Sequence, residues 1–335
     1  KLPGKSLHVH FALIVIAFFA AGISQEKEFK ALQLEKNLYT VSGVSGGNIV
    51  FLVSGDGVLV VDAGYYVSDG EAIVKTIRTV TDQPVKYLIY THFHRDHING
   101  AAGFSENITV IGHENIKENI INFNEERLNN DIEKVFPEYI KKEKEKISEL
   151  KKANSPELES HQKQLKSLVD HLENIKKIKF RYPDQTFRDS LLLKMGNEEV
   201  LLKYMGNAHT SDNIVVIFKN QNTIHVGDLI FNKIVPYVIP EHGANTQKWM
   251  NVLYNLHEQG FKTVIPGHGE ITDNNGILKM AEYFKALRSQ VEKGLKNKMP
   301  LTEIQKDQSL LETQGISYSA QFPKNIEAIY NELTQ

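Results

Sequence analysis

Four residues that can bind a metal or exchange protons lie within six positions: His92, His94, Asp96 and His97. The apolar segment 85–90 precedes them and has the character of a β-strand. Alternate side chains of an extended chain share a side, which places His92 beside His94, and the following turn can bring Asp96 and His97 to a neighbouring point. Imidazole and carboxylate groups bind Zn²⁺, and also iron or manganese. The spacing therefore predicts a metal site in a loop at the end of a strand.

Three further ligand-type residues lie in short motifs that contain glycine. His209 is in the segment GNAHT, Asp228 follows a glycine, and His268 is in the segment PGHG. Upstream, Asp62 is in the segment VDAG at the end of another predicted strand. The chain has no cysteine, so a transition-metal site in it must be built from His, Asp and Glu.

These five motifs, in this order, resemble those of the metallo-β-lactamase superfamily over residues 38–270, apart from the segment 114–180. The resemblance implies an α/β fold, the αββα four-layer sandwich, with two metal ions at one edge of its two sheets. It implies that the first ion is held by His92, His94 and His209, and the second by Asp96, His97 and His268, with Asp228 bridging both.

The resemblance also implies two zinc ions and a metal-bound hydroxide as nucleophile, with iron or manganese as alternative metals. Asp96 would be the catalytic residue that orients this nucleophile and moves a proton. Asp62 would anchor a ligand loop through hydrogen bonds, the alternative being a plain turn residue before Gly64.

Other polar residues receive weaker assignments. We expect Thr210 and Asn213 to form part of the pocket wall and His242 to lie in a loop beside the pocket. The remaining histidines with an assignment are expected to be structural, His113 and His225, or exposed to solvent, His161 and His171.

The elements that must position these residues follow from hydrophobic spacing. Strands are predicted at 38–41, 48–53, 58–61, 85–90, 190–194, 199–204, 213–218, 223–226 and 263–265, and helices around 73–80, 249–256 and 277–291. The catalytic domain is accordingly predicted to comprise residues 25–113 and 181–275, followed by a helical C-terminal extension, 276–335.

Residues 114–180 interrupt this alternation because they are rich in Lys, Glu and Asn, with apolar residues at helical spacing. Leu158, Leu165, Leu168, Leu172 and Ile175 form one stripe, and residues 139–150 contain a second. The pattern predicts a helical insertion that ends in an antiparallel hairpin. The alternative is a mobile charged segment.

Composition and the first residues bear on location and partners. Among 335 residues the formal net charge is -2, which argues against a nucleic-acid partner. Lys1 and Lys5 precede an apolar run, 11–21, and small residues before Gln25, a pattern typical of a signal peptide over residues 1–24. A periplasmic or secreted protein without a membrane partner after cleavage is expected, the alternative being an uncleaved anchor.

The sequence as a whole favours an exported binuclear hydrolase that cleaves a small ester, thioester, lactone or amide. A periplasmic β-lactamase with weak or incidental activity is the second hypothesis, and a non-catalytic metal-binding scaffold is the third. The largest β-lactamase group of the family uses a cysteine on the second metal, which this chain does not have. Neither the oligomeric state nor the substrate can be predicted from the pattern.

Overall fold

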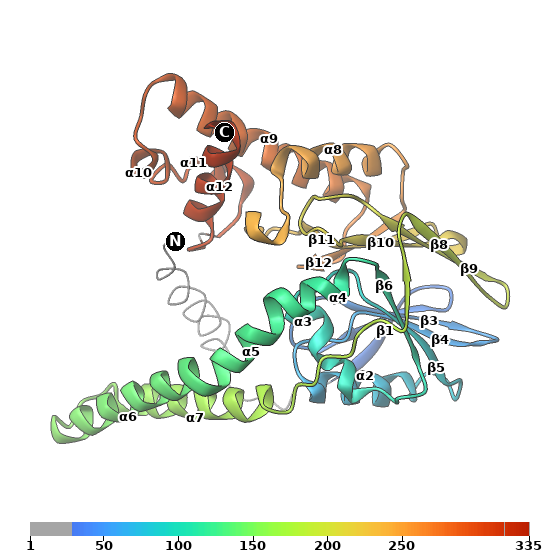
Figure 1. Ribbon diagram of the computed structural model, residues 1–335, viewed down its shortest axis with the longest axis horizontal. Coiled ribbons are helices and arrows are strands. Elements are labelled where there is room, and N and C mark those ends of the chain that lie inside the picture. The colour runs from blue at the N-terminus through green and yellow to red at the C-terminus, as the bar shows by residue number, and fades with distance from the viewer. Residues whose placement is uncertain (1–28, 318, 335) are drawn as a thin grey trace. The chain divides into compact units, whose positions relative to one another are not determined.

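The structure is a computed structural model that describes residues 29–317 and 319–334 (Figure 1). The predicted signal peptide, residues 1–24, therefore lies outside the described residues. Within them, no helix is both long and apolar enough to cross a membrane. The chain divides into two compact units, one formed by residues 29–120 and 180–335 and the other containing residues 121–179.

The first sheet of the larger unit has seven strands in the order of the sequence. They are β1 (Lys30–Glu35), β2 (Leu38–Ser42), β3 (Ile49–Ser54), β4 (Gly57–Val61), β5 (Val85–Ile89), β6 (Thr109–His113) and β7 (Gln185–Phe187). The pairs from β1 to β4 are antiparallel, and those from β4 to β7 are parallel. The carboxyl ends of β4, β5 and β6 consequently share one edge, where a ligand site of an α/β protein is expected.

The second sheet has five strands in the order β12-β11-β10-β9-β8. They are β8 (Ser190–Met195), β9 (Glu198–Tyr204), β10 (Ile214–Phe218), β11 (Thr223–Phe231) and β12 (Thr263–His268). Only the pair of β11 and β12 is parallel among them. β11 is buried along its whole length and continues beyond the predicted end at residue 226, so that Asp228 lies within the strand.

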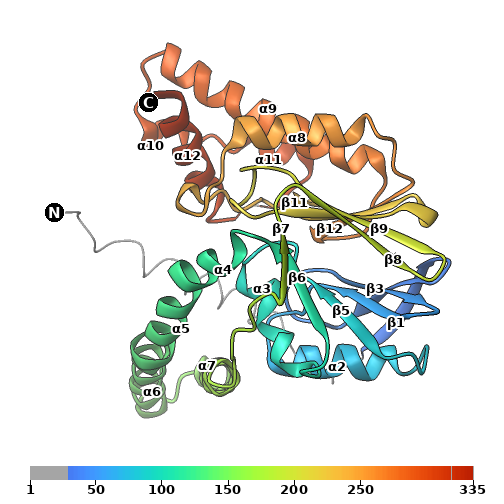
Figure 2. The ribbon, with the colours of Figure 1, turned by 45° about the vertical axis from the view of Figure 1, so that its right-hand side comes forward.

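The two sheets pack face to face, with helices on their outer faces (Figure 2). Leu52 and Val61 of the first sheet belong to one buried apolar cluster with Val200 and Phe218 of the second. α2 (Val67–Ile77) covers the first sheet, whereas α8 (Thr246–His257) and α9 (Asn274–Lys296) cover the second. These layers confirm the predicted αββα sandwich.

Short helices complete the larger unit. α3 (Arg95–Ile98) and the 3-10 turn Asn99–Gly103 follow β5, and α4 (Ile116–Asn119) follows β6. The 3-10 turns Lys219–Gln221 and Pro240–His242 precede β11 and α8. The C-terminal part contains α10 (Leu301–Ile304), α11 (Ser309–Gln314) and α12 (Phe322–Thr334), whose buried residues share an apolar cluster with α8 and α9.

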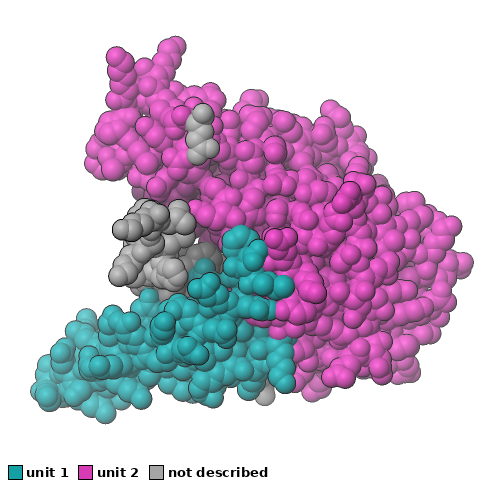
Figure 3. Space-filling model, viewed as in Figure 1, with its two compact units in different colours: residues 1–28, 121–179 teal, residues 29–120, 180–335 magenta. Residues whose placement is uncertain are grey.

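The smaller unit, drawn in teal in Figure 3, consists of helices. Two π-helical segments, Ile120–Glu125 and Asp131–Val135, flank α5 (Glu126–Asn130) and lead into the hairpin of α6 (Phe136–Lys152) and α7 (Leu158–Ile175). Ile147 and Leu150 of α6 are buried, as are Leu168, Leu172 and Ile175 of α7. Apolar burial between the two helices is the main source of this unit's stability.

One expectation for this unit is wrong. His171 was expected to be exposed, but only 3% of it is accessible, because its ring packs against Phe136 with the centroids 4.3 Å apart. His161 is partly exposed, and its Nδ1 lies 2.6 Å from a carboxylate oxygen of Glu143.

Candidate metal centre

Five segments bring the seven ligand-type residues to one edge of the sandwich. His92 and His94 follow β5, and α3 begins immediately afterwards with Arg95 and supplies Asp96 and His97. The second sheet contributes the other three residues: His209 from the loop between β9 and β10, Asp228 from within β11, and His268 as the last residue of β12.

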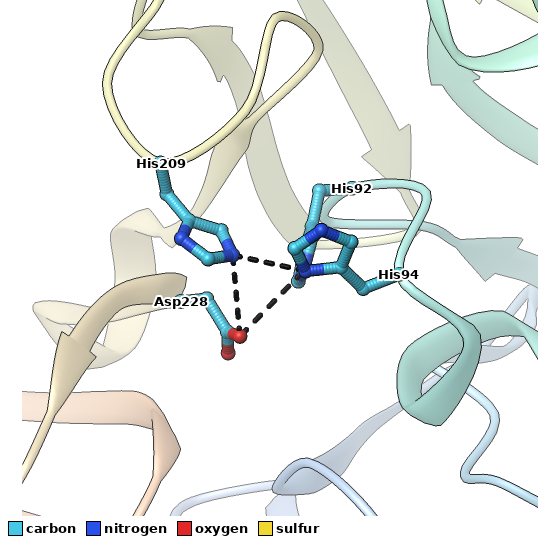
Figure 4. A group of neighbouring side chains, drawn as sticks. All are labelled: His92, His94, His209 and Asp228. Atoms are coloured by element: carbon cyan, nitrogen blue, oxygen red, sulfur yellow. Dashed lines mark hydrogen bonds and ion pairs between the residues drawn. The ribbon is translucent and has the colours of Figure 1, made fainter. Parts of the chain in front are cut away.

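The first group consists of His92, His94, His209 and Asp228, which offer ligand atoms that all lie within 4.8 Å of one another. Figure 4 shows that the four side chains converge on one point. Nε2 of His209 lies 3.0 Å from Nδ1 of His94 and 3.4 Å from Oδ2 of Asp228. Nε2 of His92 lies 3.7 Å from the same oxygen.

The second group consists of Asp96, His97 and His268. Oδ2 of Asp96 lies 3.1 Å from Nε2 of His268 and 3.6 Å from Nε2 of His97. The other oxygen of Asp228, Oδ1, lies 3.2 Å from Nε2 of His97 and 3.4 Å from Nε2 of His268. One carboxylate therefore faces both groups, with a different oxygen toward each.

The spacing of these atoms fits a metal ion in each group. Zinc–nitrogen bonds of about 2.0–2.1 Å at tetrahedral angles place neighbouring ligand atoms about 3.3–3.4 Å apart. The separations in the first group, 3.0, 3.4 and 3.7 Å, bracket that value. Nε2 of His92 is buried and has no hydrogen-bond partner among the described residues. A buried nitrogen without a partner is costly, and a metal ion at this point would satisfy it.

Charge in the pocket also favours cations. Burial alone would lower the pKa of His97 and His268, but Asp228 and Asp96 outweigh it, and the pKa of His268 rises to about 9. Burial would raise the pKa of Asp228 and Asp96, but the facing histidines hold both values well below the usual range. The carboxylates therefore remain charged and require positive charge beside them.

His92 and His94, which follow β5, have a lowered rather than a raised pKa. Burial, together with neighbouring histidines, lowers the pKa of His92 and His94 well below the ordinary value. Both rings are consequently neutral at pH 7, the form in which an imidazole can bind a metal.

Asp62 is fully buried and joins two of the ligand segments. Its Oδ1 accepts a hydrogen bond from the backbone N–H of Thr91, and its Oδ2 accepts one from the Thr91 hydroxyl, each at 2.8 Å. Oδ2 also lies 2.7 Å from Nδ1 of His97. Nδ1 of His92 lies 3.0 Å from the same Thr91 hydroxyl, so one carboxylate influences a histidine of each group. These contacts are those of the predicted anchor of a ligand loop.

Two glycines make room for the ligands. A Cβ at position 267 would lie 1.9 Å from Oδ1 of Asp228, and a Cβ at position 47 would lie 2.3 Å from the ring of His97. Any side chain at either position would displace a ligand-type residue, which explains why both positions are glycine.

The weaker predictions have mixed outcomes. Asn213 is buried beneath the loop, where its side-chain oxygen accepts hydrogen bonds from the backbone of His209 and Thr210. It therefore supports a ligand from behind, and Thr210 is likewise fully buried, so neither forms an exposed pocket wall. His113 and His225 have structural contacts, as expected, with the backbone oxygens of Arg188 and Asn48.

Sequence reasoning missed two polar residues around the site. Thr91 links Asp62 to His92, and its position directly before the first histidine was the available signal. Asp212, fully buried behind the loop of His209, has its pKa raised to about 7 by burial. His242, expected near the pocket, lies with its Nδ1 2.8 Å from Nε2 of His94.

Comparison with known proteins identifies the family. The sequence profile of the metallo-beta-lactamase superfamily matches residues 42–268, a range that includes all seven ligand-type residues. The chain belongs to this superfamily. Its homologues in the metallo-β-lactamase superfamily are metal-dependent hydrolases.

Two curated relatives and one solved structure resemble the chain. Metallo-beta-lactamase IND-1 of Chryseobacterium indologenes is 25% identical over 276 residues, which cover 79% of this chain and 92% of that protein. A linear primary-alkylsulfatase of Pseudomonas sp. is 32% identical over 73 residues, which cover 20% of this chain and 14% of that protein. The sec-alkylsulfatase Pisa1 of Pseudomonas sp. has the same fold, with a TM-score of 0.67 and 12% identity over 91% of this chain and 50% of that one.

Proposed function

We propose that this metallo-β-lactamase-fold protein is a binuclear zinc hydrolase that cleaves a small ester, thioester, lactone or amide. The observation that carries the proposal is Asp228, whose two carboxylate oxygens face two separate groups of ligand-type residues. In this assignment His92, His94 and His209 would hold one ion, Asp96, His97 and His268 would hold the other, and Asp228 would contribute to both. Iron or manganese would fit the same donors.

Two ions bound in this way would supply Lewis acidity, lowering the pKa of a water molecule to about 7 and polarising the scissile bond. The protein's own contribution begins with Asp96, which is partly exposed, with 30% of its side chain accessible. Its low pKa keeps it ionised at neutral pH, so it accepts a hydrogen bond from the attacking water and orients it. Asp62 and Thr91 keep the ligand histidines in the required orientation, which lowers the cost of assembling the site.

The substrate class has two specific alternatives. Hydrolysis of β-lactams is supported by the match to IND-1, which extends over most of both chains. Hydrolysis of alkyl sulfate esters is supported by the local match to the primary alkylsulfatase. The absence of cysteine argues for the broader hydrolase assignment, because it removes the thiolate ligand typical of the largest β-lactamase group.

We also propose that the protein acts outside the cytoplasm, in the periplasm or as a secreted protein, on a small-molecule substrate. The supporting observation is the sequence of residues 1–24, with lysines before an apolar run and small residues after it. Expression with this leader followed by fractionation and mass spectrometry tests the proposal. A mature chain beginning near Gln25 is expected, and an intact leader on a cytosolic protein would contradict export.

The catalytic proposal is tested by hydrolysis assays on the zinc-loaded protein. The panel contains aryl esters, thioesters, lactones, amides, a chromogenic cephalosporin and alkyl sulfates. We expect turnover of at least one of the first four classes, its loss on treatment with a strong chelator, and its recovery when zinc is restored. Turnover confined to the cephalosporin or to alkyl sulfates would replace the proposed substrate class by that alternative. Activity that survives complete removal of metal would refute a metal-dependent mechanism.

A further inference from the structure

We propose that His242 is a positioning residue for the metal centre, because it fixes which nitrogen of His94 is available to the first ion. The inference rests on the proposed function, since it concerns a ligand of that centre. The two ring nitrogens of His94 have different neighbours. Nδ1 faces Nε2 of His209 at 3.0 Å, within the first group, and Nε2 faces Nδ1 of His242 at 2.8 Å.

This geometry determines the proton positions once a metal is bound. The ligand nitrogen of His94 must be Nδ1, because that atom lies among the other members of the first group. Nδ1 must then be unprotonated, which leaves the proton of the neutral ring on Nε2. Nε2–H donates to Nδ1 of His242, so the proton of His242 is on its own Nε2. The imidazole of His242 thus serves His94 as the carboxylate of Asp62 serves His97.

The backbone around His242 is held against the loop of another ligand. The carbonyl oxygen of His242 accepts a hydrogen bond from the N–H of Ser211 at 2.9 Å, and the N–H of Asn245 donates to the carbonyl of Ala208 at 2.9 Å. Ala208 and Ser211 lie on either side of His209 in the sequence, so these two bonds join the loop of His209 to the segment that contains His242. Gly243, with φ of +93°, allows the close approach, because a Cβ there would lie 2.9 Å from the nitrogen of Ser211. The position of His242 is therefore coupled to that of His209.

The C-terminal helix holds the same loop from its other side. Asn325 of α12 is fully buried, its side-chain NH₂ donates to the carbonyl of Pro236 at 2.7 Å, and its oxygen accepts from the N–H of Val238 at 3.2 Å. Two turns later on α12, Glu332 accepts hydrogen bonds from the backbone and hydroxyl of Thr246. The loop that carries His242 is thus fixed before and after it, so its imidazole is pre-organised rather than recruited by the metal.

Two substitutions separate the hydrogen bond from the packing of the ring. His242→Phe keeps an aromatic ring against Phe93, whose centroid lies 5.0 Å away, but removes the acceptor. His242→Asn places an amide oxygen close to the position of Nδ1 and restores an acceptor. His257→Phe is the matched control, because it also removes an imidazole that is hydrogen-bonded, in this case to Asn274.

The readouts are zinc affinity, measured by competition with a chromophoric chelator, and the absorption spectrum of the cobalt-loaded protein. We expect His242→Phe to lower the affinity of one of the two ions about 10- to 100-fold, the usual effect of losing such a partner. Its cobalt spectrum should change, because ligand geometry determines that spectrum. The affinity of His242→Asn and of His257→Phe should stay within about threefold of the wild-type value.

Three outcomes would overturn the inference. Wild-type affinity in His242→Phe would show that His94 does not need this partner, and an equal loss in His242→Asn would show that ring packing matters rather than the acceptor. An equal loss in His257→Phe would show a general effect of removing a hydrogen-bonded histidine. If the wild-type chain bound no metal, the proposed function itself would fail. Two ions in the wild type with no response in His242→Phe would refute only this inference.

Discussion

Replacing Asp62 by asparagine tests whether this buried carboxylate orients His97 for metal binding. The change keeps the size of the side chain and the acceptor for the Thr91 N–H, but it places an NH₂ group where Oδ2 now faces the Thr91 hydroxyl and Nδ1 of His97. Asn also tolerates the left-handed backbone of position 62, where φ is +63°. Local strain is therefore unchanged, and the effect can be assigned to hydrogen bonding.

The magnitude follows from the bonds that are lost. The Thr91 hydroxyl can rotate and accept a hydrogen bond from the new NH₂ group, whereas the bond from His97 Nδ1–H to a carboxylate disappears. Hydrogen bonds to charged groups contribute about 1.5–3 kcal/mol, so the metal-free protein should lose about that much unfolding free energy. The NH₂ group also favours His97 with its proton on Nε2, the nitrogen that faces Asp96 and Asp228. Zinc affinity of one site should consequently fall about 10- to 100-fold.

The assay combines urea unfolding of the metal-free protein with a zinc competition titration. Asp69→Asn is the matched control, because Asp69 is also buried and accepts three backbone N–H bonds, from Ser45, Tyr65 and Tyr66. That variant should lose a comparable amount of stability while keeping zinc affinity within about threefold of the wild type. Unchanged zinc affinity in Asp62→Asn, or an equal loss in Asp69→Asn, would refute the proposed role of Asp62.

Three further predictions concern catalysis and protons. Asp96→Asn should lower kcat about 10²- to 10⁴-fold at saturating zinc. A kcat near the wild-type value would contradict the role of Asp96 in orienting the attacking water. The pKa of Asp212 is about 7 in the folded chain and about 3.9 when unfolded, so its contribution to stability is complete below about pH 4 and is lost as the pH rises to about 7. The unfolding free energy of Asp212→Asn should therefore fall by up to about 4 kcal/mol less than that of the wild type between pH 4 and 8. The same pH dependence of unfolding free energy in both proteins would refute this. The pKa of His97 and His268 is raised in the metal-free protein, so zinc uptake at pH 7.5 should release protons. Calorimetry in buffers of different ionisation enthalpy measures this release. A binding enthalpy that does not depend on the buffer would contradict the prediction.

Much of the fold could be predicted because its buried strands are bounded by clear turn signals. The Asp56-Gly57 pair lies between the predicted strands 48–53 and 58–61 and is a hairpin signal, and β3 and β4 pair antiparallel across it. β7 escaped notice because it has only three residues. β1 was missed because none of its side chains is buried, so it lacks an apolar alternation. β11 was predicted too short because Gly227 was interpreted as its end, whereas the strand passes through that glycine with φ of +51°.

The candidate ligands could be selected from the sequence because they lie in compact motifs, and the structure brings all seven to one place. Their supporting partners were harder to predict. His242 reaches His94 across 148 positions of sequence. Its loop is placed by hydrogen bonds donated by Ser211 and Asn325, which no local pattern encodes. His171 was different, because it follows Leu168 at a helical spacing of three and belongs to the same buried face.

The central claim is that one aspartate joins two metal sites. Its most direct test is the number of metal ions bound per chain, measured by elemental analysis after equilibration with excess zinc and removal of unbound metal. The wild-type protein should retain two ions, and Asp228→Ala should retain fewer, because the carboxylate that faces both groups is gone. A folded wild-type chain that never retains more than one ion in excess zinc would contradict the binuclear centre.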